Sequence, residues 1–466
     1  MPLRLARAEL LLKQTELPTT GREMAYNSSG RKPFERASKI SHAQIINNPA
    51  VQAMLARCTL PAPSSPDEIA QSLIAVPDEM PEHINYVVAV DGSLSEAPVR
   101  PQYPAAAITF FVTGPLLFSL RDLDRLAEQP TIDPADMTKL KKISRHSLVL
   151  PTANVSLDGR DLASSVRSAL HEFLCEERVG TRLQDTLRWL VFEQFHSTGP
   201  SEWHVPSCPY GCGHAPLVFR PTDPDEHACP SCGKPVWLVD VLRLHERIDD
   251  ESGAGAVSSY VLSALETLVL IDVIRQIVQH YGAEQLRTTA FIKDGPLATF
   301  GVISGLVRPL RSLSMHLMAS RASGSVLNLV GLEKSGPFVE HAQQIEDRIP
   351  PGHALLLTDD YIKHYIMPGN QSPDVYGRTT YWGNKLIFKA PDGNLYVASV
   401  PAGDLHAAPA VEDFSNLFDM LAVIARLRCS MYDNALLPVA LANKLVSLSE
   451  YPSTEILRIF ATETVA

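Results

Sequence analysis

The chain has 466 residues, of which 45% are hydrophobic and 20% charged; this composition is typical of a globular protein and excludes a mainly disordered one. It is too long for one ordinary domain. Because the net charge is −11, any binding of nucleic acid requires a local cluster of Lys and Arg, since the surface as a whole is acidic.

The N-terminal region is predicted to be mainly helical up to about residue 80, with a Pro/Ser-rich loop at residues 61–66. Residues 1–16 carry charges and lack the apolar segment of a signal peptide. The best candidate for a membrane span, residues 262–278, is interrupted by three charged residues. We therefore expect a cytoplasmic protein that does not contact a membrane.

The next region changes to the pattern of a β-sheet. Residues 86–90, 106–113 and 116–120 are apolar and rich in β-branched or aromatic side chains, and they predict an antiparallel start to the sheet. Gly114-Pro115 is expected to form a turn between the second and third of these strands. The first strand is expected to end in a turn at Asp91-Gly92-Ser93.

Helices are predicted after these strands. Residues 121–200 are expected to be helical, because residues 162–174 and 183–195 have clear helical periodicity. Residues 201–240 are rich in Pro, Gly and Cys, which marks a small compact insertion. Residues 257–281 predict a long amphipathic helix.

The insertion carries four of the seven cysteines in two short pairs, each closed by glycine: Cys208, Cys212, Cys229 and Cys232. Four thiolates at this spacing are typical of a tetrahedral zinc site with no open position, so we expect structural zinc. His214 and His227 are alternative ligands or ordinary loop histidines. The zinc is expected to brace the insertion, contact DNA or bind a partner.

Two apolar runs lead into the same Asp-Gly pair, at Asp91 and, after residues 289–293, at Asp294. Each pair alone is more often a plain β-turn. Two such carboxylates on adjacent strands would form a site for a hard divalent cation. Glu266, within an apolar helical segment, is a candidate third ligand, because a buried carboxylate needs a positive partner. The alternative is a helix-edge glutamate that reaches solvent.

The rest of the chain is predicted to alternate between strands and helices. The strands are expected at residues 326–330, 354–357, 384–389 and 395–400, and the helices at 308–318, 414–428 and 436–448.

The order of these motifs resembles the NurA family of nucleases, over roughly residues 80 to 450. The resemblance rests on Val88-Ala-Val-Asp91-Gly-Ser93, Leu265-Glu266, Phe291-Ile-Lys-Asp294-Gly-Pro-Leu297 and Val330-Gly-Leu-Glu-Lys334-Ser335, and on the strand at residues 395–401 followed by two helices. It implies a mixed α/β fold with an RNase H-like sheet flanked by helices.

The resemblance also implies a nuclease that depends on Mn²⁺ or Mg²⁺. Asp91, Glu266 and Asp294 would hold the metal, and Lys334 would lie near the scissile phosphate. The family has a histidine in the last helix where this chain has Asn443, whose carbonyl oxygen is a possible replacement ligand. We expect Asp91 to bridge two cations.

Four segments are expected on this basis. They are a helical N-terminal region (1–80), a first part of the nuclease core (81–120), a helical insertion with the zinc ribbon (121–255), and a second part of the core with the C-terminal helices (256–466).

The chain lacks a Walker A motif, so any motor that feeds it DNA is a separate protein. The resemblance implies a HerA-like hexameric ATPase as that partner, a homodimer of this chain, and a role in DNA repair or defence against phage. Basic residues that are candidates to hold DNA are Lys139, Lys141, Lys142 and Arg145, or Arg308, Arg311 and Arg321. The alternatives are a non-catalytic adaptor that binds DNA or a motor through its ribbon, and a transposase- or resolvase-like enzyme.

Overall fold

A computed structural model of the chain describes residues 44–58, 63–100, 102–122, 145–178, 180–249, 251, 253–319, 324–427, 436–448 and 453–465. The chain divides into two units, Met1–Pro61 and Ala62–Ala466. In the first unit, helix α3 (Pro49–Leu55) begins at Asn48, whose side chain accepts a hydrogen bond from the Ala50 amide, and none of its residues is buried.

The second unit contains a nine-stranded sheet with the order β1-β11-β12-β13-β10-β9-β2-β3-β4. Its strands are β1 (Leu73–Ala75), β2 (Tyr86–Arg100), β3 (Ala106–Ser119), β4 (His146–Ala153), β9 (Thr289–Asp294), β10 (Asn328–Glu333), β11 (His353–Leu356), β12 (Asn384–Lys389) and β13 (Leu395–Val400). The central strands β2, β9 and β10 are parallel, and the other pairs are antiparallel. The expected mixed α/β architecture is confirmed.

The described residues of this unit also form helices. They are α4 (Pro66–Gln71), α7 (Leu162–Cys175), α8 (Leu183–Val191), α9 (Ser258–Tyr281), α10 (Val307–Met318), α11 (Pro337–Gln344), α12 (Asp359–Tyr361), α13 (Leu417–Arg426), α14 (Leu437–Val446) and α15 (Ser453–Val465). Short turns of helix are η1 (Leu238–Leu242), η2 (Leu244–Arg247), η3 (Gly255–Val257), η4 (Ala283–Thr288), η5 (Gly301–Leu306), η6 (Glu346–Arg348), η7 (Ile362–Ile366) and η8 (Val411–Asp413).

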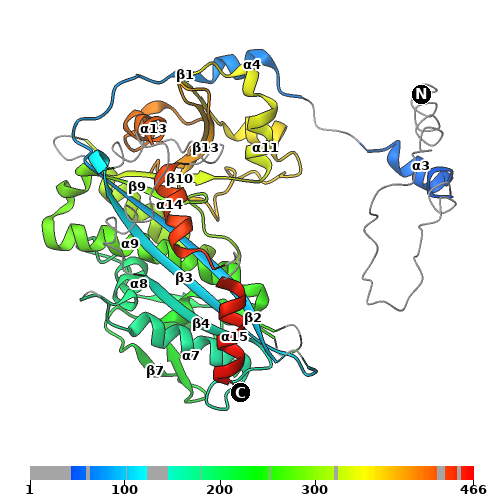
Figure 1. Cartoon of the computed structure of the whole chain (residues 1–466), viewed down its shortest axis with the longest axis vertical. Coiled ribbons are helices and arrows are strands. Elements are labelled where there is room, and N and C mark those ends of the chain that lie inside the picture. The colour runs from blue at the N-terminus through cyan, green and yellow to red at the C-terminus, as the bar shows by residue number, and fades with distance from the viewer. Residues whose placement is uncertain are drawn as a thin grey trace. The chain divides into compact units, whose positions relative to one another are not determined.

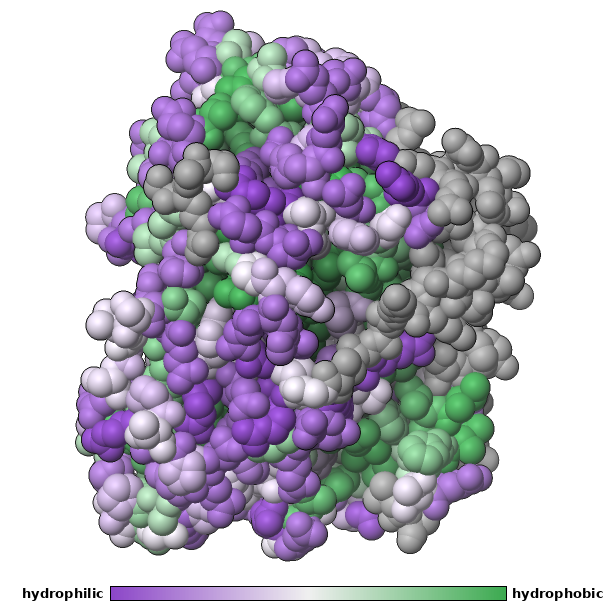
Figure 2. Space-filling model, turned by 90° about the vertical axis from the view of Figure 1, so that its left-hand side faces the viewer, coloured by the Kyte–Doolittle hydropathy of each residue, from purple (hydrophilic) through white to green (hydrophobic). Residues whose placement is uncertain are grey.

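The two faces of the sheet are covered by different helices. Side chains alternate along a strand, so Val88 and Val90 of β2 join one core with α7, α8, α9 and α10. Val87 and Ala89 of β2 join a second core with α13 and α14. Figure 1 shows α14 and α15 along the long strand β2, which both helices contact. On the face of the molecule drawn in Figure 2, apolar side chains gather in patches between hydrophilic ones.

The turns predicted at Asp91-Gly92-Ser93 and at Gly114-Pro115 are wrong. Both segments lie inside continuous antiparallel strands, where Val90 pairs with Pro115 and Asp91 pairs with Gly114. Strand β4 pairs with β3 only as far as Thr113. At Pro115, β3 therefore pairs with β2 on one side and has no strand on the other. No backbone N–H is needed on that open side, so a proline is tolerated there.

The helical expectation for residues 121–200 is wrong at His146–Ala153, which forms the edge strand β4. Buried and exposed residues alternate over most of this segment, which is the period of a strand. The helices expected near 162–174 and 183–195 are confirmed as α7 and α8. The long helix expected at 257–281 is confirmed as α9.

The long helix α9 is also more apolar than expected from its sequence, in which three charged residues interrupt the apolar residues 262–278. Gly255–Tyr281 is long and apolar enough to cross a membrane by length and composition, but 67% of its most apolar window is buried within the protein. We therefore assign it as a core helix of this unit.

Candidate functional site

Parallel pairing brings the two Asp-Gly segments together. Strand β2 pairs with β9 up to Val90 opposite Lys293, so Asp91 and Asp294 are the next residues on neighbouring strands. On the other side of β9, Asp294 pairs with Leu332 of β10. The structure therefore places Asp91 and Asp294 at adjacent positions of neighbouring strands.

The two strands behave differently beyond this point. Strand β9 ends at Asp294, because Gly295 has a φ of 83° and folds back so that its amide donates to the Leu332 carbonyl at 2.7 Å. Strand β2 continues to Arg100. The chain therefore turns away after the second Asp-Gly pair only.

Asp91 is a buried carboxylate, and one of its oxygens has no hydrogen-bond partner among the described residues. Only 3% of the residue is exposed. Its Oδ1 accepts the Gly92 amide at 2.7 Å, whereas Oδ2 is buried and has no hydrogen-bond partner among the described residues. Burial, with the nearby charges of Asp294 and Glu266, raises the pKa of Asp91 to about 8. An orphaned carboxylate oxygen beside two other acids fits a cation.

Glu266 is also buried, on α9, so the alternative of a solvent-facing helix-edge glutamate is wrong. Its Oε2 lies 3.2 Å from the Nζ of Lys293, which also donates to the Asp294 carbonyl at 2.8 Å. Burial raises the pKa of Glu266, and the Lys293 ammonium opposes that rise. The helix approaches the sheet closely here, because a Cβ on Gly92 would lie 2.7 Å from Leu262 Cδ1 and 3.1 Å from Glu266 Oε1.

Lys334 follows β10 and pairs with Asp294, with Nζ 2.7 Å from Oδ2. Its side chain is 39% exposed, against 4% for that of Lys293. The exposed ammonium is thus placed at the edge of the carboxylate group.

The three carboxylates are neighbours without forming a closed ligand set. In the part of the chain that the structure describes, only the four cysteines bring three or more candidate ligand atoms within 4.8 Å of one another. Two of the carboxylates are held by lysines instead, Glu266 by Lys293 and Asp294 by Lys334.

Asn443 lies on α14, the helix that contacts β2 on the Val87 and Ala89 face. Five residues further on, the Leu448 amide donates to Ser93 Oγ at 3.1 Å. The Asn443 side chain is exposed, and no hydrogen bond joins it to Asp91 among the described residues.

The candidate basic residues fall into different settings. Arg311 is buried and donates to the carbonyls of Tyr381 and Arg378, at 2.9 and 2.8 Å, so it supports the fold and is not a DNA contact. Arg308 is exposed and lies over the Trp203 ring at 5.3 Å. Arg145 is exposed. Residues outside the described ranges are Lys139, Lys141, Lys142 and Arg321.

Lys293 is the residue of this site that the sequence argument missed. It stands in the apolar run Ala290-Phe-Ile-Lys293, and it faces α9 because Phe291, two residues earlier, joins that core. A lysine inside a buried strand together with a glutamate inside an apolar helix was the available signal for a buried ion pair.

The cysteine cluster has the dimensions of a zinc site. The Sγ atoms of Cys208 and Cys232 lie 3.9 Å apart, and those of Cys212 and Cys229 lie 3.8 Å apart. A tetrahedron with Zn–S bonds of about 2.3 Å has S–S edges of about 3.8 Å, whereas a disulfide requires about 2.05 Å. Neither histidine belongs to this cluster of four thiols: His214 Nδ1 lies 3.0 Å from Ser231 Oγ, and the His227 ring packs on Phe219.

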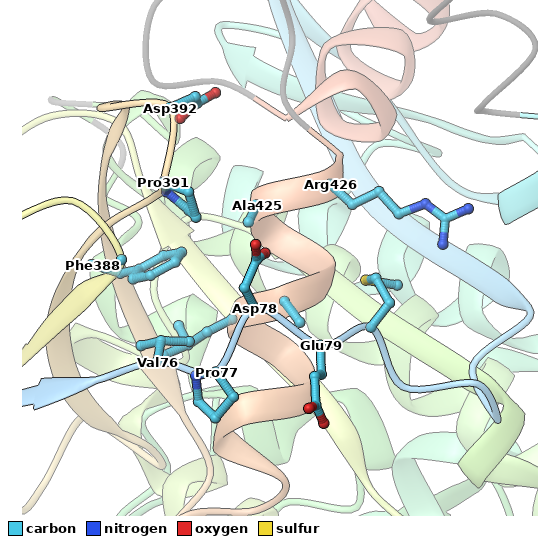
Figure 3. Close-up of a pocket in the computed structure, with 13 residues that line it drawn as sticks. Val76, Pro77, Asp78, Glu79, Phe388, Pro391, Asp392, Ala425 and Arg426 are labelled. Atoms are coloured by element: carbon cyan, nitrogen blue, oxygen red, sulfur yellow. The ribbon is translucent and has the colours of Figure 1, made fainter.

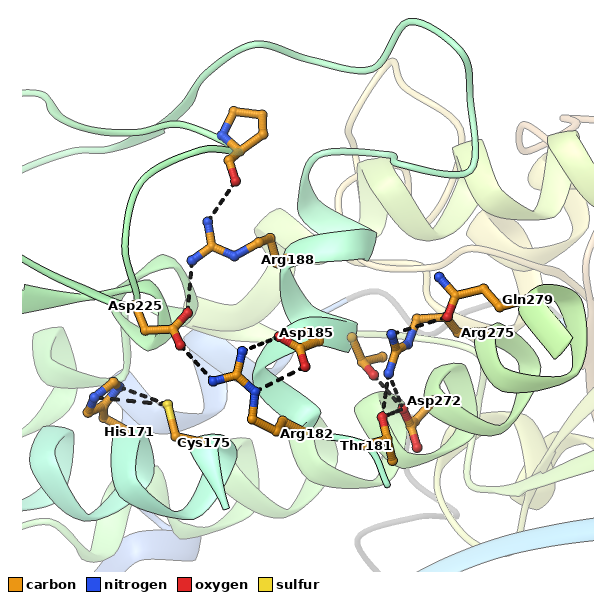
Figure 4. A network of polar contacts seen from close by, with 12 residues as sticks. His171, Cys175, Thr181, Arg182, Asp185, Arg188, Asp225, Asp272, Arg275 and Gln279 are labelled. Carbon is orange, nitrogen blue, oxygen red and sulfur yellow. Dashed lines mark hydrogen bonds and ion pairs between the residues drawn. The ribbon is translucent and has the colours of Figure 1, made fainter. Parts of the chain in front are cut away.

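The ribbon strands β5 (Trp203–Val205), β6 (Leu217–Phe219), β7 (Glu226–Ala228) and β8 (Pro235–Trp237) form two small sheets that share a core with α7, α8 and α9. Arg167 of α7 binds Asp240 with two bonds of 2.7 Å and lies over the ring of Tyr210. Asp225 accepts from Arg182 and Arg188 (Figure 4). The ribbon is therefore packed against helices α7, α8 and α9.

A separate pocket lies between the chain after β1 and helix α13 (Figure 3). Its lining includes Asp78, Glu79, Phe388 and Arg426, and it shares no residue with the carboxylate group.

No protein-family model matches the chain, and no curated protein matches its sequence. The crystal structure of the NurA nuclease from Sulfolobus solfataricus matches with a TM-score of 0.32 and 8% identity, over 92% of this chain and 97% of that one. Crystal structures of NurA and of NurA with manganese each match with a TM-score of 0.29 and 12% identity, over 92% of this chain and 99% of theirs. At such low TM-scores the roles of the carboxylates and lysines rest on this chain's own geometry. These three solved structures, to which the chain is similar, are structures of NurA.

Proposed function

We propose that this chain is a divalent-cation-dependent nuclease that hydrolyses phosphodiester bonds in DNA. The observation that carries the proposal is the buried, unpartnered oxygen of Asp91 beside Asp294 and Glu266. Burying such an oxygen in its ionised form is unfavourable unless a cation compensates its charge. DNA is proposed as the substrate because the order of motifs around these residues resembles the NurA family.

Asp91 and Asp294 are the residues proposed to hold the cation. Carboxylate oxygens select the hard ions Mg²⁺ and Mn²⁺. When bound, such an ion would lower the pKa of a water molecule and offset negative charge on the phosphate. Gly92 supports this arrangement by letting α9 approach the site, where a larger residue would collide with Leu262.

Lys334 is proposed to bind the scissile phosphate. Its ammonium is partly exposed and already lies 2.7 Å from Asp294, so it stands beside the place where a phosphate would meet a cation held by the same carboxylates. A positive charge preorganised next to the reacting phosphorus stabilises the extra negative charge of the transition state.

Finer parts of the function rest on the resemblance and remain proposals. These are a HerA-like hexameric ATPase as the motor partner, a homodimer, a cytoplasmic location, and a role in DNA repair or in defence against phage. The cysteine cluster is proposed to hold structural Zn²⁺, because its four thiolates leave no open position.

The test is cleavage of linear DNA by the purified full chain with Mn²⁺, alone and with its motor. Asp91→Asn is compared with Asp78→Asn, which changes an exposed acid in the separate pocket. We expect cleavage to be lost in the first variant and kept in the second. Cleavage that persists in Asp91→Asn would refute the proposed site.

A non-catalytic adaptor is the second candidate, and one observation favours it. Lysines already neutralise Glu266 and Asp294, as expected for a site that needs no metal. The adaptor predicts DNA or motor binding with no cleavage under any condition, and no effect of Mn²⁺ on the unfolding midpoint.

A further inference from the structure

The three carboxylates of the proposed site differ in their positive partners. Glu266 is paired with Lys293 at 3.2 Å, and Asp294 is paired with Lys334 at 2.7 Å. Asp91 has no ion-pair partner among the described residues, and its Oδ2 has no hydrogen-bond partner there either. The place for an added cation is therefore at Asp91.

The two lysines also differ in how easily their ammonium groups can move away from the carboxylates. The Lys334 side chain is 39% exposed, so its ammonium can move away from Asp294, toward water or a bound phosphate, when a cation takes its place. The Lys293 side chain is 4% exposed and holds both Glu266 and the Asp294 carbonyl. Displacing its ammonium within the core would leave a buried charge without a partner, which is strongly unfavourable.

Glu266 is held at one oxygen and lies close to β2 at the other. Its Oε2 accepts from Lys293, and its Oε1 lies 3.1 Å from the position that a Cβ of Gly92 would occupy. The ion pair with Lys293 therefore fixes the carboxylate where α9 packs most closely on β2.

The net charge of the three carboxylates and two lysines also favours a single divalent cation. If all three carboxylates are ionised, two ammonium groups leave the cluster with one negative charge. One divalent cation turns this into a small positive charge that suits a phosphodiester anion. Two divalent cations beside a lysine that cannot leave would place like charges close together in a buried region, which is unfavourable.

We infer that, if the proposed function holds, the site binds one divalent cation at Asp91 and Asp294, and that Lys293 occupies on Glu266 the place of a second cation. Glu266 then acts as a positioning residue for Lys293 and does not ligate metal. This replaces the two-cation arrangement expected from the sequence. The dependence of cleavage on Mn²⁺ concentration is then of first order.

The test is the number of Mn²⁺ ions bound per full-length, zinc-loaded chain, counted by electron paramagnetic resonance without DNA. We expect one ion in the wild-type protein and no spin coupling between ions. Lys293→Met releases Glu266 and is expected to bind two coupled ions. Lys385→Met is the matched control, because it breaks another buried Lys–Glu pair, with Glu333, outside the carboxylate group, and it is expected to bind one.

Each other outcome has a distinct meaning. Two coupled ions in the wild-type protein, or one ion in Lys293→Met, would overturn the inference and leave the nuclease proposal standing. Equal Mn²⁺ binding by wild type and Asp91→Asn, or none by either, would instead overturn the proposed metal site. If Lys293→Met does not fold, the double variant Lys293→Met/Glu266→Gln removes both buried charges; its expected stoichiometry of one equals that of the wild type, and two ions would contradict the inference.

Discussion

Replacing Asp91 by asparagine is expected to stabilise the protein in the absence of Mg²⁺ and Mn²⁺. The carboxyl pKa is raised from an ordinary 3.8 to about 8, first by burial and then by Asp294 and Glu266. Between these two values the folded protein keeps a proton that the unfolded chain has lost, so stability falls as pH rises through this window.

The size of the effect follows from the width of that window. Each pH unit is worth about 1.4 kcal/mol, so ionised Asp91 costs at most about 5 kcal/mol at pH 8. Asparagine still buries an amide that lacks one partner, which costs about 1–3 kcal/mol. We therefore expect Asp91→Asn to gain about 2–4 kcal/mol at pH 8, and clearly less at pH 5.

Urea unfolding at pH 5, 6.5 and 8, without added divalent cations, measures this difference. Asp78→Asn is the control, since that carboxylate is exposed. Added Mn²⁺ should raise the wild-type midpoint and leave that of Asp91→Asn unchanged. If Asp91→Asn is less stable than the wild type at pH 8, or if its gain in stability does not grow with pH, Asp91 is not a buried carboxylate whose ionisation destabilises the protein without a cation.

Three further predictions concern other buried groups. Glu266→Gln is expected to destabilise the protein by about 3–5 kcal/mol in urea, because it leaves Lys293 buried without a partner; the double change with Lys293→Met should recover most of this loss, and a neutral single variant would contradict the ion pair. Burial, with the neighbouring arginine, lowers the pKa of His146 to about 4, so stability should fall by about 1–3 kcal/mol as pH drops from 6.5 to 4. The unfolding midpoint of His146→Gln should therefore depend less on pH over this range. An unchanged pH dependence would exclude this histidine as its source. Cys212→Ser should lose bound zinc, measured by metal analysis, and lower the unfolding temperature, whereas Cys58→Ser, outside the cluster, should change neither; a serine variant that keeps its zinc would rule out the four-thiolate site.

The parts of the site that could be predicted are those encoded over a few residues. Apolar runs that end in Asp-Gly located Asp91 and Asp294, and the spacing of Cys208, Cys212, Cys229 and Cys232 located the ribbon. Their meeting also required β2 and β9 to be parallel neighbours, and that pairing is a property of the tertiary structure.

The errors arose where a distant partner decides the local structure. Asp91-Gly92 is a common turn sequence, but β3 pairs with it along its whole length and keeps it extended. Residues 146–153 became a strand because β3 offered them an edge. Arg311 has the sequence features of a DNA contact, yet it binds backbone carbonyls in the core.

By itself, the sequence determined which residues could supply carboxylates and thiolates, because alternation, turn chemistry and cysteine spacing act over short distances along the chain. Only the tertiary structure decided which charge each carboxylate meets. Lys293 and Glu266 are 27 residues apart, and their pairing depends on how closely α9 approaches β2 at Gly92. That approach is set by packing between a helix and a strand from different parts of the chain.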